Sequence, residues 1–206
     1  MSERPLNICL IRSGETDWDL DERCQGTGNL PLSAEGIKQS ATRCSQWLPH
    51  PTIRTIYCGP DEASLHTARL FAQCGRSIKT RPLSDLLEVD MGLWQGLRRS
   101  ELADRYPKAH ACWEDDPTQC TAPGGESGRE ALRRLKGVIR KRSRRTSDPQ
   151  AIGLTLVLRP VLMKIALHHL CNQNRPMQMD QTTGSWIFGP CHNHPHQQSE
   201  LGRLSA

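Results

Sequence analysis

Residues 7 to 18 read NICLIRSGETDW, and this stretch decides how the fold is interpreted. Its first six residues, which end at Arg12, form a short apolar run that is typical of a buried β-strand. The run breaks at Gly14, where a loop is expected. Ligands of α/β proteins bind beyond the carboxyl ends of parallel strands. The polar residues that follow this strand are therefore the first candidates for a functional site.

Strand-like and helix-like segments alternate along the rest of the chain. Ser33 is a suitable N-cap, and the apolar residues after it recur at the spacing of one helix face. Pro160 suits the first turn of another helix, which is expected to end near Cys171. The predicted strands are 7–12, 53–58 and 154–158, and the predicted helices are 33–48, 61–74, 100–106, 126–145 and 160–171, with a surface loop at 115–125.

A strand followed by a helix appears three times, and this order predicts the architecture. Such units place their helices against the faces of a parallel sheet. We therefore predict an α/β fold, a three-layer sandwich with a mostly parallel central sheet covered on both faces. Arg12, Cys58 and Arg159 are expected at the carboxyl ends of the strands.

Composition limits the class of protein and its compartment. The 206 residues suit one domain, and the net charge of +5 favours anionic ligands only weakly. No segment approaches the ~18 apolar residues of a membrane span, and the first residues lack the pattern of a signal peptide. Nine scattered cysteines without a CxxC pair favour reduced thiols. We predict a cytoplasmic protein without a membrane partner, in which Cys9, Cys44 and Cys171 act as small core hydrophobes.

The end of the chain differs from the rest. Residues 189–206 are polar and aperiodic, so we predict one domain at 1–188 followed by a disordered tail. The tail holds Cys191, His192, His194 and His196, which are potential metal ligands. Because histidines on a flexible segment bind metals without a preformed site, we interpret this set as adventitious. No metal and no cofactor are predicted.

Five ordered blocks of the sequence are similar to motifs of one known family. The first, LIRSGETDW at 10–18, resembles the arginine-histidine-glycine-glutamate-threonine run of the histidine phosphatase superfamily. The others are 25–36, YCGPDEASLHTA at 57–68, 87–96 and PGGES at 123–127. The resemblance implies a phosphoglycerate-mutase-like fold and phosphoryl transfer through a phosphohistidine. It covers residues 7 to 127, and the last third matches poorly.

The resemblance also assigns roles to positions, and several of these hold a different residue. The family's nucleophilic histidine falls on Ser13, and serine is a weak nucleophile unless a base activates it. The first phosphate-binding arginine is retained as Arg12, whereas the second falls on Ala63. The family's acid falls on Glu88. A position that often holds asparagine is Asp19, which adds negative charge near the phosphate site.

The family's second histidine has two candidate positions. The stretch LRPV at 158–161 offers Arg159 or Pro160, and neither is a histidine. The resemblance therefore implies a degenerate member that lacks the catalytic histidines. We expect its residual phosphate-binding groups to be Arg12, Gly14, Gln25 and Arg159.

These departures favour a pseudoenzyme that binds an anionic phospho-ligand, either a phosphorylated small molecule or a protein partner. The alternative is an active phosphomonoester phosphatase or phosphoglycerate-mutase-like enzyme with a rearranged site, in which Ser13 and Glu88 are catalytic. A second alternative is a nucleic-acid-associated protein, because residues 129–145 contain nine Lys or Arg. This segment has one apolar helix face and no interleaved aromatic residues, so nucleic acid is the less favoured partner.

Overall fold

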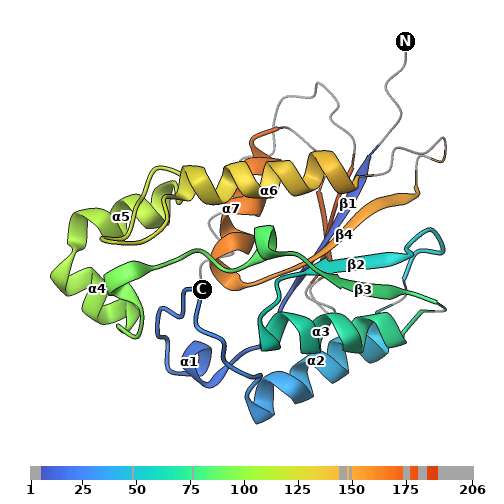
Figure 1. The fold of residues 1–206 in the computed structure, drawn as a ribbon, viewed down its shortest axis with the longest axis horizontal. Helices are drawn as coiled ribbons and strands as arrows, with labels where there is room; N and C mark the ends of the chain where they lie inside the picture. The colour runs from blue at the N-terminus through green and yellow to red at the C-terminus, as the bar shows by residue number, and fades with distance from the viewer. Residues whose placement is uncertain are drawn as a thin grey trace.

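The chain is built around one sheet of six strands. A computed structural model describes residues 6–47, 49–75, 77–143, 148, 150–173, 177–180 and 185–189. The strands are β1 (Asn7–Arg12), β2 (Thr55–Cys58), β3 (Lys79–Pro82), β4 (Ile152–Leu158), β5 (Met177–Asp180) and β6 (Ser185–Phe188). Their order is β3-β2-β4-β1-β6-β5, and the first four of this series run parallel (Figure 1). β6 is antiparallel to β1, and β5 is antiparallel to β6. The predicted, mostly parallel sheet is confirmed.

Two pairs of helices cover the two faces of this sheet. α2 (Ala34–Gln46) and α3 (Glu62–Gln73) pack on one face, where Ile11 and Val157 belong to the core. α6 (Gly128–Arg142) and α7 (Pro160–Cys171) pack on the other, where Leu10 and Leu156 belong to the core. Both faces of β1 and β4 are thus buried, which explains their continuous apolar sequences. The three-layer sandwich is confirmed (Figure 1).

Helix caps explain where these helices begin. The side chains of Ser33, Asp61 and Ser127 each accept a hydrogen bond from the backbone N–H three residues further on. α7 begins differently, with Pro160 at its first position, where a missing N–H costs nothing. The predicted N-cap at Ser33 and the predicted helix from Pro160 to Cys171 are both confirmed.

The sequence patterns did not predict three strands, β3, β5 and β6. β3 is an edge strand with the exposed sequence KTRP, so it has no apolar alternation from which a strand is recognised. They also did not predict α5 (Pro107–Asp115), which has no fully buried residue. The remaining elements are α1 (Asp17–Leu20), α4 (Arg99–Arg105) and two 3₁₀ turns, Ser84–Leu86 and Gly92–Trp94.

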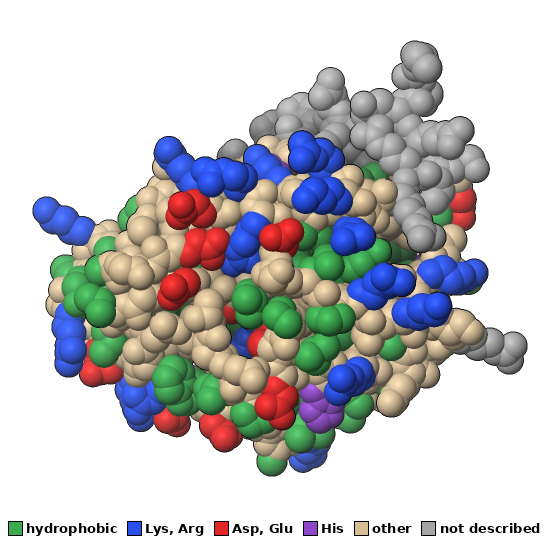
Figure 2. All heavy atoms as spheres, in the orientation of Figure 1, with side chains coloured by type: hydrophobic (Ala, Val, Ile, Leu, Met, Phe, Trp, Pro, Cys, Tyr) green, Lys and Arg blue, Asp and Glu red, His purple; other side chains and the backbone are tan. Residues whose placement is uncertain are grey.

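α6 is the basic helix of the sequence, and it packs as an amphipathic helix. Ala131, Leu135 and Val138 are buried, and Figure 2 shows Lys and Arg side chains along the edge of the molecule that α6 forms. The helix ends at Arg142, and the predicted continuation over 144–145 lies outside the described residues. Its exposed basic side chains are Arg129, Arg133, Lys136, Arg140, Lys141 and Arg142.

One expectation about the cysteines is wrong. Cys44 of α2 and Cys74 at the end of α3 form a disulfide, although the sequence favoured reduced thiols and assigned Cys44 to the core as a small hydrophobe. The two residues are 30 positions apart, so no short sequence motif predicts that they pair. It becomes visible only when α2 and α3 are packed side by side. Cys9 is buried as predicted.

The described helices include none that is long and apolar enough to cross a membrane. The predicted tail, apart from Gly189, falls outside the residues that the structure describes, as do Cys191 and the histidines of the tail.

Candidate functional site

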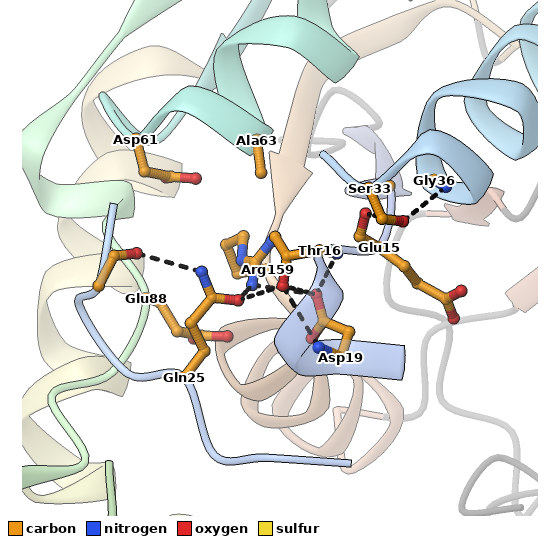
Figure 3. A network of polar contacts seen from close by, with 12 residues as sticks. Glu15, Thr16, Asp19, Gln25, Ser33, Gly36, Asp61, Ala63, Glu88 and Arg159 are labelled. Atoms are coloured by element: carbon orange, nitrogen blue, oxygen red, sulfur yellow. Dashed lines mark hydrogen bonds and ion pairs between the residues drawn. The ribbon is translucent and has the colours of Figure 1, made fainter. Parts of the chain in front are cut away.

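The candidate site lies at the carboxyl ends of β1, β2 and β4 (Figure 3). The backbone N–H of Ser13 donates to the carbonyl of Leu158 at 2.9 Å, which extends the pairing of β1 with β4 by one residue. Ser13 therefore lies beside Arg159, the first residue after β4. Asp61 and Ala63, at the start of α3, lie across from Arg159 and Gln25 (Figure 3).

Ser13 is buried, with only 1% of its surface exposed. Among the described residues, its hydroxyl Oγ has no hydrogen-bond partner. A serine hydroxyl becomes a strong nucleophile when a neighbouring base accepts its proton. No such base contacts Ser13 in the part of the chain that the structure describes.

Gly14 is fixed between α2 and α3. Its backbone N–H donates to the hydroxyl of Thr67 at 3.0 Å, and Thr67 in turn donates to the carbonyl of Ala63 at 2.8 Å. A Cβ atom at position 14 would come within 2.4 Å of the Ser40 hydroxyl, so glycine is required for this close approach. The N–H that we expected to face a bound anion is thus already used inside the protein.

Arg159, and not Pro160, occupies the end of β4 beside Ser13. Its side chain is 2% exposed, and Nη2 donates to Asp19 Oδ2 at 3.2 Å and to Gln25 Oε1. Its other terminal nitrogen, Nη1, has no partner among the described residues. The positive charge of Arg159 is therefore paired inside the protein, while its Nη1 amino group has no partner among the described residues.

Asp19 is held in place by the start of α1. The backbone N–H of Thr16 donates to Asp19 Oδ2 at 2.8 Å, and the backbone N–H of Asp19 donates to Thr16 Oγ1 at 3.3 Å, which together form a capping box. Thr16 Oγ1 also lies 2.9 Å from Gln25 Oε1 (Figure 3). The role of Thr16 was not predicted, although the Thr-x-x-Asp spacing at 16–19 is a sequence signal for such a cap.

Glu88 accepts hydrogen bonds from the first turn of α7. Its Oε2 accepts the N–H of Val161 at 2.8 Å, and its Oε1 accepts the N–H of Leu162 at 2.7 Å. Oε1 also accepts the N–H of Val89 at 2.9 Å. Burial raises the pKa of Glu88 to about 7, although Arg159 and these N–H groups act in the opposite direction. The carboxylate thus satisfies two buried donors that the first turn of a helix leaves unpaired.

Arg12 does not join this cluster. Its half-buried side chain forms no hydrogen bond or ion pair with any described residue. The charge of Arg12 lies near Arg43 of α2. Burial, and then the repulsion from Arg12, lower the pKa of Arg43. The structure brings Ser13, Gln25, Glu88 and Arg159 together around the ends of β1 and β4, whereas the guanidinium of Arg12 has no partner among the residues that the structure describes.

Comparison with known proteins finds relatives among phosphatases. Residues 8–188 match the Histidine phosphatase superfamily (branch 1). The chain is 32% identical over 132 residues to the bifunctional protein Rv2228c of Mycobacterium tuberculosis, which covers 64% of this chain and 36% of that protein. It is 28% identical over 134 residues to phosphoserine phosphatase 1 of Hydrogenobacter thermophilus, which covers 65% of this chain and 63% of that protein. The chain thus matches less than two thirds of the length of either relative.

Solved structures share the fold. The mycobacterial glucosyl-3-phosphoglycerate phosphatase Rv2419c superposes with a TM-score of 0.68 at 20% identity, over 82% of this chain and 81% of that chain. YhfR of Bacillus stearothermophilus superposes with a TM-score of 0.66 at 20% identity, over 93% of this chain and 98% of that chain. The family match also extends through the last third of the chain, where the sequence resemblance was poor. With the strand order, the site at the strand ends and these matches in agreement, the chain belongs to branch 1 of the histidine phosphatase superfamily.

Proposed function

We propose that this protein is a pseudoenzyme of its superfamily, which binds an anionic phospho-ligand and does not transfer the phosphoryl group. The observation that carries the proposal is the buried hydroxyl of Ser13, which contacts no base among the described residues. The family resemblance assigns the nucleophile to this position. Without a base to take its proton, serine at neutral pH attacks phosphorus poorly.

The end of β4 supports the same proposal. Stabilising a transferring phosphoryl group requires positive charge aimed at its oxygens. The guanidinium of Arg159 is instead paired with Asp19. Glu88, at the position of the family's acid, holds the N–H groups of Val161 and Leu162. Its use as an acid would disturb the start of α7.

Within the described part of the site, three groups without a protein partner are available to a ligand. These are the guanidinium of Arg12, Nη1 of Arg159 and the hydroxyl of Ser13. All three are hydrogen-bond donors, and two of them are charged, so they favour a phosphate or carboxylate oxygen. We therefore propose a phosphorylated small molecule or a phosphorylated protein partner as the ligand.

The relatives favour an alternative, an active phosphomonoester phosphatase. One relative is phosphoserine phosphatase 1, and another is the adenosylcobalamin/alpha-ribazole phosphatase of Salmonella typhimurium, which is 28% identical over 134 residues. In this alternative Ser13 is the nucleophile, and Glu88, whose pKa burial raises to about 7, is the acid. The rearranged site would then use a serine at the position where the resemblance implies a histidine.

Steady-state hydrolysis of p-nitrophenyl phosphate separates the two proposals. We expect no turnover above that of the Ser13→Ala variant and no acid-labile phosphoprotein. Ser40→Ala is the matched control, because Ser40 is equally buried and its hydroxyl is also unpaired among the described residues. Turnover at ~1 s⁻¹ or faster that Ser13→Ala abolishes and Ser40→Ala retains would refute the pseudoenzyme and establish the alternative.

Thermal stabilisation by inorganic phosphate tests the binding function. Phosphate should raise the Tm of the wild type, because a ligand of the native state stabilises it. Arg12→Ala should abolish this shift, whereas Arg81→Ala, an exposed arginine on the edge strand β3, should retain it. If the Arg12→Ala variant responds to phosphate like the wild type, the anion site is elsewhere.

A further inference from the structure

Cys44 and Cys74 bring the ends of α2 and α3 together. Cys44 lies in the last turn of α2, and Cys74 directly follows α3. Their Cα atoms are 6.5 Å apart, within the range that native disulfides span. We propose that this pair is a redox modification site, which is oxidised reversibly by a small disulfide and fastens α2 to α3. The inference does not depend on the proposed function.

Each of the two bonded sulfurs also lies near a backbone carbonyl. Cys44 Sγ lies 3.0 Å from the carbonyl of Leu70, and Cys74 Sγ lies 3.0 Å from the carbonyl of Cys44. A thiol is a weak hydrogen-bond donor, so each reduced sulfur has a backbone acceptor within reach. Once reduction separates the two sulfurs, each thiol therefore has a backbone acceptor nearby.

Burial disfavours reaction at five of the six other cysteines that the structure describes. Thiol–disulfide exchange needs a thiolate and an accessible sulfur. Burial raises the pKa of Cys9 and of Cys58 to about 12, and that of Cys24 to about 11. Burial also raises the pKa of Cys120 and of Cys171. Cys44 and Cys74 are both partly exposed.

A cavity next to Cys74 in the chain offers space for a small disulfide near the pair, although neither cysteine lines it. The cavity has a volume of about 400 Å³ and begins at Gly75, the next residue of the chain. The exposed Arg54 lines its other side. The arginine favours a reagent that carries carboxylates. The remaining lining residues are Pro49, His50, Pro51, Ile53, Ser77 and Ile78.

The proposed reaction is a balanced exchange with a disulfide RSSR. The thiolate of one cysteine attacks RSSR to form a mixed disulfide and expels RS⁻, which takes up the proton that the cysteine lost. The second cysteine loses its proton, attacks the protein sulfur of the mixed disulfide and expels a second RS⁻, which is protonated in turn. The protein loses two electrons and two protons, and RSSR is reduced to two RSH.

The Cys44–Cys74 disulfide links the two helices that position the loop after β1. Gly14 donates to Thr67 of α3 and is packed against Ser40 of α2. A link between the other ends of α2 and α3 restricts the separation of these helices in the unfolded and partly open states. Oxidation should therefore stabilise the face of the sheet that holds the site loop.

The test compares the full-length protein after treatment with oxidised glutathione and after treatment with dithiothreitol. Peptide mapping of the oxidised wild type should find a Cys44–Cys74 cross-link, and its Tm should exceed that of the reduced protein by about 5 to 10 °C. Cys44→Ser and Cys74→Ser should remove this difference. Cys112→Ser, a change at another partly exposed cysteine, should retain it.

Either of two results would overturn the proposal. One is oxidised wild type whose cross-link joins other cysteines, such as Cys112 and Cys120. The other is a Tm difference of unchanged size in both Cys44→Ser and Cys74→Ser. The peptide map requires only the wild type, so it decides the question even where a serine variant folds poorly.

Discussion

The polar side chains at the end of β4 bind partners inside the protein, whereas those of Arg12 and Ser13 at the end of β1 have none among the described residues. Arg159 pairs with Asp19, and Glu88 accepts three backbone N–H groups. The hydroxyl of Ser13 and the guanidinium of Arg12 have no such partners in the described part of the chain. The difference indicates that the β4 end has become part of the framework that stabilises the fold. Under the proposed function the β1 end binds the ligand, and we expect it to contribute little to stability.

The largest expected effect is the loss of stability when Arg159 is removed. Arg159→Ala leaves the largely buried Asp19, which is 12% exposed, without its cation and should cost about 3 kcal/mol of the free energy of unfolding. Urea denaturation measures this value. The matched control is Arg134→Ala, because the Arg134 and Glu126 side chains form an ion pair while 17% and 20% exposed. Equal losses for the two variants would show that the β4 end has no special structural role.

The next effect is a pH dependence of stability that arises from Glu88. Its pKa in the folded protein is about 7, above its ordinary value of 4.5, so the folded state keeps the proton to higher pH than the unfolded state. This group's contribution is therefore complete below about pH 4.5 and is lost as the pH rises to about 7, a change of about 3 kcal/mol.

The Glu88→Gln variant lacks this titrating carboxyl group. The free energy of unfolding of the variant, relative to that of the wild type, should therefore rise between pH 5 and pH 8. Denaturation curves at the two pH values give this comparison. Glu101→Gln is the control, because Glu101 accepts a backbone N–H at an exposed helix start. A constant difference between the wild type and Glu88→Gln would contradict the assignment.

A change at Asp19 would leave Arg159 at the β4 end without its ion-pair partner, so that it resembles Arg12 at the β1 end. Asp19→Asn removes the anion that neutralises Arg159, so phosphate should bind about tenfold more tightly, as expected for the loss of one partly screened charge. Isothermal titration with phosphate measures the change. Asp17→Asn is the control, because Asp17 is exposed on the same short helix. Equal affinities in the two variants would mean that the ion pair does not limit anion binding.

The smallest effect is expected at Ser13. Its buried hydroxyl has no described partner, so Ser13→Ala should change the free energy of unfolding by less than about 0.5 kcal/mol. Ser33→Ala removes a buried hydroxyl that caps α2 and should cost about 1 kcal/mol. Thermal denaturation of the two variants is sufficient. A larger loss at Ser13 than at Ser33 would reveal a structural partner for the Ser13 hydroxyl.

Periodic and locally determined features could be predicted from the sequence. The apolar run of β1, the cap at Ser33 and the helix after Pro160 each depend on a few neighbouring residues, and each was found as predicted. β3 could not be found in this way, because an exposed edge strand is defined by its pairing with β2. The Cys44–Cys74 disulfide likewise depends on how two helices pack.

Sequence reasoning identified the site residues better than the partners of those residues. It placed Arg159 at a strand end and Glu88 at the position of the family's acid. Only the folded chain shows that Asp19 pairs with Arg159 and that Glu88 holds the start of α7. These contacts join residues 140 and 74 positions apart. Contacts between residues so far apart in the chain leave no local signal in the sequence. The ion pair with Asp19 neutralises the positive charge of Arg159, which the sequence alone assigned to phosphate binding.

The position of β1 in the sheet has a consequence for the order of folding during synthesis. β1 is made first, yet its two neighbours in the sheet are β4 and β6, and the Asn7 side chain bonds to a carbonyl 144 residues later in the chain. Closing so long a loop is slow, and β1 stays unpaired until the last strands leave the ribosome. The apolar run of β1 is therefore a segment that chaperones would encounter on the nascent chain.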